Sequence, residues 1–140
     1  MSGNKPNMRY QGEEWFRINR PELDGEDIRV SKCYIKQGRK VWWIDIPEWL
    51  VENSDGHTNL LCEIGEGIGK HFHHLRVPRA YFVENRALLD YREYGGRVRS
   101  RGYKYSLHLS ASADNRFRDL RGAGRLDFSV FSYSPDGGEN

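Results

Sequence analysis

The sequence predicts an α+β fold: a largely antiparallel sheet of about six to seven short strands, with one main helix packed on it and one or two short helices. Three observations support this prediction. Short runs of residues alternate between apolar and polar, turn residues separate these runs, and one longer segment has helical spacing. The length of 140 residues suits one domain over residues 13–133, with flexible segments at 1–12 and 134–140.

The longest stretch with clear hydrophobic order covers residues 71–91. Its first part, 71–77, is short and β-prone. Pro78 follows, and proline is favoured at the first position of a helix because its missing N–H is not needed there. We therefore expect a strand that leads into a helix over 78–91. The side chains expected on the sheet-facing side of that helix are Tyr81, Phe82, Leu88 and Leu89.

Shorter runs predict the remaining elements. The linker 37–40 contains glycine and lies between two β-patterned runs, which is a hairpin signal. Residues 41–46 are apolar on both faces, so we expect a central strand with other parts of the chain packed on both of its faces. Ser112 is a candidate N-cap for a short helix over 113–121. The other expected strands cover residues 14–18, 27–36, 60–64, 103–110 and 126–133.

Composition indicates a folded chain rather than a disordered one. Aromatic residues make up 13% of the sequence, whereas disordered chains are poor in them. The first residues lack the apolar core of a signal peptide, and no run of about 18 apolar residues could span a membrane. Cys33 and Cys62 form no disulfide framework, and their apolar context predicts buried free thiols. A cytoplasmic protein is therefore expected.

Charged residues are distributed unevenly along the chain. Residues 41–69 contain no Lys or Arg, whereas residues 70–125 are rich in arginine. Such asymmetry indicates an oppositely charged partner. The alternative is that the two segments interleave in space and neutralise one another.

The strongest functional signal is the basic and aromatic segment 97–125. Arginine binds phosphate in a bidentate geometry, and aromatic rings between cations form a platform for bases. We therefore predict binding of nucleic acid, or of another polyanion, without sequence preference and without a cofactor. DNA and RNA are not distinguished. The residues predicted to form this face are Arg97, Arg99, Arg101, Tyr103, Lys104, Arg116, Arg118 and Arg121.

A protein-interaction module, of an adaptor or inhibitor kind, is the first alternative. In this hypothesis the acidic region 45–66 forms the contact together with an exposed Trp42 or Trp49. Tryptophan and arginine are typical anchors of protein interfaces. The identity of such a partner does not follow from the sequence.

A magnesium-dependent nuclease is the second alternative. Asp45 and Glu63 are acids inside apolar strands, where a carboxylate is costly unless it is paired, hydrogen-bonded or metal-bound. An Asp on one strand and a Glu on the next resembles, in outline, the magnesium site of the PD-(D/E)XK nucleases. The resemblance implies phosphodiester hydrolysis by Mg²⁺ held on both carboxylates. The lysine of that family would fall at Gly65, so Lys70 would have to take its role near the attacking water.

A metal site at the histidines is a weaker alternative. His71 and His73 are two residues apart, so on a strand they point the same way and could chelate a metal. No further ligand has diagnostic spacing, and structural zinc usually needs four ligands. We therefore expect no metal there, and the sequence as a whole favours a binding module over an enzyme.

Overall fold

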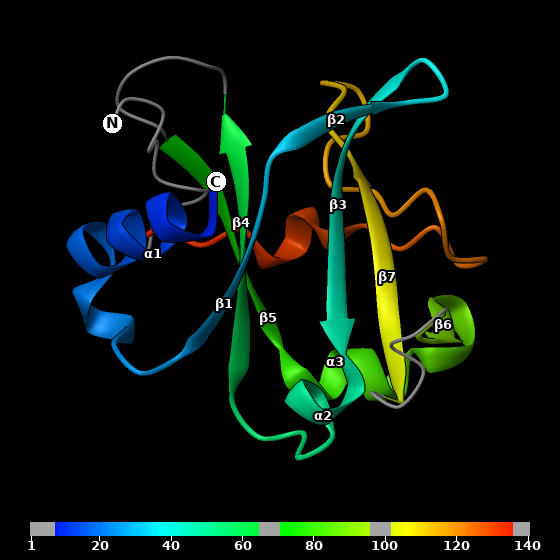
Figure 1. The fold of residues 1–140 in the computed structure, drawn as a ribbon, viewed down its shortest axis with the longest axis horizontal. Coiled ribbons are helices and arrows are strands. Elements are labelled where there is room, and N and C mark those ends of the chain that lie inside the picture. Colours follow the sequence, from blue (N-terminus) through cyan, green and yellow to red (C-terminus); the bar gives the residue numbers. More distant parts are fainter. Residues whose placement is uncertain (1–7, 65–70, 96–101, 136–140) are drawn as a thin grey trace.

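The computed structural model describes residues 8–64, 71–95 and 102–135, and its α+β fold confirms the predicted class (Figure 1). The helices are α1 (Met8–Asn19), α2 (Glu48–Val51) and α3 (Arg79–Glu84), with 3₁₀ turns η1 (Pro21–Leu23), η2 (Arg86–Leu88) and η4 (Phe128–Phe131). The strands are β1 (Asp27–Ser31), β2 (Cys33–Lys36), β3 (Arg39–Pro47), β4 (His57–Ile64), β5 (His71–Pro78), β6 (Asp90–Glu93) and β7 (Tyr103–Ser110).

The strands form two sheets that share one extended stretch of chain. One sheet has three strands in the order β1-β4-β5, and the other has four in the order β2-β3-β7-β6. All pairs are antiparallel except β1 with β4. Only Lys32 separates β1 from β2, so the chain passes directly from the first sheet into the second (Figure 1).

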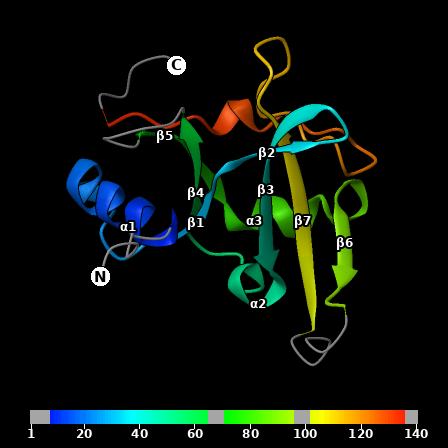
Figure 2. The same cartoon turned by 45° about the horizontal axis from the view of Figure 1, so that its top comes forward.

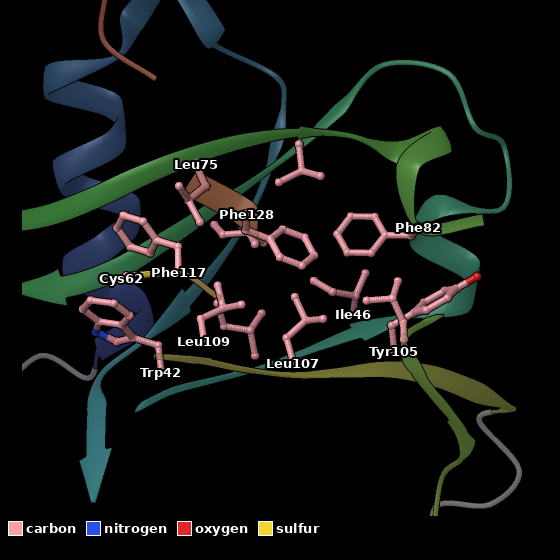
Figure 3. Close-up of a cluster of buried hydrophobic side chains, with 14 of the residues drawn as sticks. Trp42, Ile46, Cys62, Leu75, Phe82, Tyr105, Leu107, Leu109, Phe117 and Phe128 are labelled. Carbon is pink, nitrogen blue, oxygen red and sulfur yellow. The ribbon is translucent and has the colours of Figure 1, made fainter. Parts of the chain in front are cut away.

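The main core lies between the two sheets (Figure 3). Alternation along a strand sends every second side chain to the same face, and the core side of the four-stranded sheet carries Trp42, Ile44, Ile46, Tyr105, Leu107 and Leu109. Phe82 from α3 and Phe128 from η4 are fully buried against them. Burying one such side chain contributes roughly 1.5–3 kcal/mol to stability.

The helix α1 corrects the prediction of a strand over residues 14–18. It begins at Met8, inside the segment expected to be flexible, and packs Phe16 into a second cluster with Leu61 and Phe72. The ring of Trp15 meets Phe72 edge-on at 5.6 Å between centroids. Tryptophan, phenylalanine and isoleucine favour strands locally, but docking against the three-stranded sheet decides the conformation.

The predicted helix over 78–91 is wrong in its second half. The helix begins after Pro78 as expected, but α3 ends at Glu84, and residues 90–93 form β6 against β7. Phe82 is buried as expected, and Leu89 is 7% exposed, but Leu88 is 42% exposed. Sheet pairing therefore overrides the helical spacing of the sequence.

The predicted helix over 113–121 is also absent from the described chain. Phe117 has a φ of 71°, a left-handed conformation that no α-helix can contain. The buried carboxylate of Asp119 instead accepts the backbone N–H groups of His108, Arg121 and Gly122. This carboxylate replaces the helical hydrogen bonds and fixes an irregular loop.

Three strand predictions also need correction. Residues 126–133 form η4 and isolated bridges rather than a strand. Residues 27–36 divide into β1 and β2, which belong to different sheets. Residues 41–46 lie in β3 but are covered on one face only, because Trp43 is 40% exposed. The strands expected at 60–64, 71–77 and 103–110 lie within β4, β5 and β7.

The hairpin between β2 and β3 is confirmed. Gln37 and Gly38 form its turn with φ values of 53° and 78°, the left-handed pair typical of a two-residue hairpin. The cysteines differ from the prediction, since Cys62 is buried but Cys33 is exposed. Both are free thiols.

Candidate nucleic-acid interface

The four-stranded sheet turns one face away from the core. In its register Trp43 pairs with His108, and Asp45 pairs with Ser106. These residues alternate with the core side chains of β3 and β7, so they project to the opposite side. Figure 2 shows α3 behind β3 and β7, on the core side. We call the opposite side the outer face, and its side chains include Lys36, Arg39, Trp43, Asp45, Asp90, Arg92, Tyr94, Lys104, Ser106 and His108.

Asp45 is the central acceptor on the outer face. Its Oδ1 accepts from the Nε1–H of Trp43 at 3.1 Å and from the hydroxyl of Ser106 at 3.0 Å. Its Oδ2 accepts from Nζ of Lys104 at 3.0 Å. A carboxylate with this many donors is compensated without a metal, and it holds both the indole and the lysine in place.

Aromatic rings and cations alternate across the outer face. Nζ of Lys36 lies 5.5 Å from the ring centroid of Trp43, and Nζ of Lys104 lies 5.1 Å from that of Tyr94. The ring of His108 meets Trp43 edge-on at 5.0 Å. Such cation–π contacts are worth about 0.5–1 kcal/mol each at exposed sites. The contacts leave part of the Trp43 ring open to solvent.

Arg121 extends this face beyond the strands. It forms an ion pair with Asp90, and its NH1 lies 3.3 Å from Nε2 of His108. Burial and then the charge of Arg121 lower the pKa of His108. The imidazole is therefore neutral at pH 7, and its Nε2 accepts from the guanidinium.

Asp90 is held by two arginines. Partial burial opposes its ionisation, but hydrogen bonds from Arg92, at 2.8 Å, and from Arg121 outweigh that cost and lower the pKa of Asp90. Lys36, in contrast, has no carboxylate partner within the described residues. Each carboxylate on the outer face is therefore matched by at least one cation.

The structure brings together only some of the predicted binding residues. Lys104 and Arg121 meet on the outer face. Tyr103 lies on the other side of β7, where it stacks on Tyr91 at 5.0 Å. Arg116 and Arg118 are exposed on the loop after β7, and Arg118 pairs with Asp127 at 3.9 Å. Arg97, Arg99 and Arg101 lie outside the described residues.

Trp43 and His108 were not among the binding residues predicted from the sequence. Alternation over 103–110 places Lys104, Ser106 and His108 on one polar face. Trp43 was expected to be buried because its strand is apolar on both sides. The signal that could have found it is the acid two residues later, since Asp45 needs a donor close by.

The acidic and basic segments of the chain do meet in space. Asp45 pairs with Lys104 at 3.0 Å, and Glu48 pairs with Arg86 at 3.4 Å. Both pairs join the acidic region of the sequence to the basic region that follows it. Part of the charge asymmetry is therefore neutralised inside the fold.

The carboxylates of the nuclease alternative lie in different sheets. Asp45 is on β3, and Glu63 is on β4, where its Oε1 accepts the backbone N–H of Cys33 at 3.3 Å. Asp45 instead binds Lys104, and Lys70 lies outside the described residues. Nothing in these contacts brings the two carboxylates to one ion.

The described structure brings no further metal ligand to His71 and His73. His71 is exposed, whereas His73 packs edge-on against Trp42 and Phe117 at 5.5 and 5.1 Å. Across residues 8–64, 71–95 and 102–135, His, Cys, Asp and Glu side chains form no group of three or more that could hold a metal.

The two tryptophans of the interaction alternative differ in exposure. Trp42 is 3% exposed and belongs to the core, so it is not the surface anchor that was expected. Trp49 on α2 is 63% exposed. Only Trp49 remains available for such a contact.

Comparison of the chain with models of protein families, with curated proteins and with solved structures finds no match. None of the helices in the described part of the chain combines the length and the apolar character needed to cross a membrane.

Proposed function

We propose that the outer face binds single-stranded nucleic acid without sequence preference. The observation that carries this proposal is the exposed ring of Trp43, which Asp45 and His108 hold between the cations Lys36 and Lys104. Sheet faces with exposed aromatic rings stack the bases of single strands, and neighbouring cations follow the phosphates.

The chemistry of each group fits this use. A base stacks on the open part of Trp43, which contributes roughly 1–3 kcal/mol per base in comparable sites. Lys36 has no carboxylate partner within the described chain and is available to a phosphate. Arg92 and Arg121 share one carboxylate, Asp90, so they leave positive charge in excess there.

The connection between β6 and β7 adds further cations in the sequence. Arg97, Arg99 and Arg101 lie in this connection, and both strands that it joins contribute to the outer face. We include these arginines in the proposed interface because of this position in the chain. Tyr103, on the other side of β7, is left out of it.

The experiment is a fluorescence-anisotropy titration of a labelled oligothymidylate at low and moderate salt. We expect the affinity to fall with salt by a log–log slope of about −0.7 per phosphate neutralised. Lys36→Gln removes one contact and reduces the magnitude of the slope by about 0.7. The matched control is Arg17→Gln, an exposed cation on α1, which packs against β1 of the other sheet.

A pair of tryptophan variants tests stacking. Trp43→Ala weakens binding by about 1–3 kcal/mol if a base lies on the ring. Trp49→Ala removes an exposed tryptophan outside the outer face and leaves binding unchanged. Absence of binding at low salt, or equal effects of the two variants, overturns the proposal. Absence of binding would favour the protein-interaction alternative instead.

A further inference from the structure

A second site lies at the end of the molecule where β4 ends and the β2–β3 hairpin turns (Figure 1). An open pocket of about 470 Å³ lies here, on the core side of the hairpin rather than on the outer face. This volume is within the range of sites for small molecules. The lining residues that matter are Ile35, Lys40, Trp42, Ile64, His73 and Arg116.

The inner wall of this pocket is aromatic and rigid. Trp42 and Phe117 stack at 5.4 Å with an angle of 23° between their planes, and they lie side by side in Figure 3. His73 closes the wall edge-on against both rings. The indole N–H of Trp42 donates to the backbone oxygen of Glu63 at 3.0 Å, which fixes its orientation.

The rim of the pocket is apolar. Ile35 projects from β2 and Ile64 ends β4, and both are large apolar side chains exposed to solvent. They come from different sheets, and the pocket brings them to the same opening. A flat apolar molecule that enters here would remove water from both isoleucines.

Two cations also line the pocket. Lys40 belongs to β3 and Arg116 to the loop after β7, and a hydrogen bond from N of Ala111 to O of Lys40, at 2.9 Å, joins these two segments. Within the described residues, neither cation has a carboxylate partner. Glu63 lines the pocket too, but its carboxylate accepts the N–H of Cys33.

The protonation of His73 agrees with a positive local potential. Burial and then the charge of Arg116 lower the pKa of His73. The imidazole is therefore neutral at pH 7 and serves as part of the aromatic wall. The positive charge of the pocket belongs to Lys40 and Arg116.

We propose that this pocket binds a small aromatic carboxylate. Its ring system lies against Trp42 between Ile35 and Ile64, and its carboxylate lies between Lys40 and Arg116. Apolar surface alone would not select an anion. Two cations without a carboxylate partner in the described part of the chain, beside an aromatic wall, complement a ligand with one flat apolar end and one anionic end.

The test compares 2-naphthoate with its neutral isostere 2-naphthamide by isothermal titration calorimetry. We expect 2-naphthoate to bind at least about ten-fold more tightly, because a hydrogen bond to a charged group is worth more than a neutral one. Equal affinities for the two probes, or no binding of 2-naphthoate at millimolar concentration, overturn the proposal.

Variants locate the charge that selects the carboxylate. Arg116→Gln and Lys40→Gln each reduce the preference for 2-naphthoate over 2-naphthamide. Arg39→Gln is the matched control, because Arg39 is the neighbouring exposed cation and alternation directs it to the outer face of β3. The indole ¹H–¹⁵N resonance of Trp42 reports that each variant is folded and shifts when the probe binds. An unchanged preference in both pocket variants also contradicts the proposal.

Discussion

The Nε2 of His74 lies 2.7 Å from Oδ1 of Asn59 in the interior between α1 and the three-stranded sheet. Nε of Arg20 donates to Nδ1 of the same ring at 3.0 Å, so the ring proton is on Nε2 and is donated to Asn59. The amide of Asn59 donates in turn to Glu26 at 3.0 Å. A continuous chain of hydrogen bonds therefore links the residues before β1 to β4 and β5.

This arrangement makes stability depend on the protonation of His74. Burial, followed by the charges of Arg20 and Arg76, lowers its pKa to about 3 from the usual 6.5. Between these values the unfolded chain binds a proton that the folded chain excludes, so stability falls as pH decreases from 6.5 towards 3. At pH 5 we expect a loss of about 2 kcal/mol from this residue alone, measured by urea unfolding at pH 7 and pH 5.

The control for this prediction is His74→Gln. Glutamine does not titrate, and its amide offers one acceptor and one donor group in place of the ring nitrogens. Three other histidines with lowered pKa values, His57, His73 and His108, remain in the variant. The difference in pH dependence between the two proteins therefore isolates His74. The same pH dependence in both would contradict the assignment.

Neighbouring leucines provide a test of the segment after α3. Leu89 is 7% exposed and packs in the main core, whereas Leu88 is 42% exposed. We expect Leu89→Ala to reduce the free energy of unfolding by about 2–5 kcal/mol. Leu88→Ala should reduce the free energy of unfolding by clearly less. Chemical denaturation of both variants checks this, and a larger cost for Leu88 would favour the continuous helix that the sequence predicts.

Gly122 lies where the loop after β7 meets η2. A Cβ atom at this position would lie 2.5 Å from the backbone oxygen of Leu88 and 2.8 Å from Oδ2 of Asp119. We therefore expect Gly122→Ala to destabilise the protein by about 1–3 kcal/mol, as overpacking does. Gly95→Ala is the control, because among the described residues, apart from its chain neighbours, no atom lies within 4 Å of its added Cβ. Equal thermal midpoints would show that the loop relaxes freely.

Magnesium should have no specific effect on stability. Asp45 is already compensated by Lys104, Ser106 and Trp43, and Glu63 lies on a strand of the other sheet. A ligand that binds only the folded state raises the melting temperature. We expect millimolar Mg²⁺ to leave it unchanged in the wild type and in Asp45→Asn alike. A rise in the wild type that Asp45→Asn abolishes would restore the nuclease alternative.

The sequence predicted those elements whose signal is local. β7 alternates in its own residues, and the turn at Gln37 and Gly38 has the glycine that its backbone needs. The helix α1 was not predicted because its conformation depends on packing of Phe16 against Phe72, a residue more than fifty positions away in the chain. The strand β6 was missed for the same reason, because its pairing with β7 replaces a helical pattern.

The candidate face was predicted only in part. Alternation along β7 is visible in the sequence and places Lys104 and His108 on its polar side. The apolar pattern of β3, however, does not reveal which of its faces lacks a covering layer, and Asp45 is the one residue in it that indicates the exposed side of Trp43. The pairing of Asp90 with Arg121 depends on the irregular loop, which Asp119 organises through tertiary contacts.

The passage of one extended stretch through both sheets limits how the chain length can change at Lys32. Ser31 pairs with Cys62 in one sheet, and Cys33 pairs with Trp42 in the other. Side chains alternate with a period of two. Inserting one residue at the bend would therefore turn the core-facing side chains of either β1 or β2 towards solvent. Insertions of even length preserve this parity, and we expect two extra residues to be tolerated better than one.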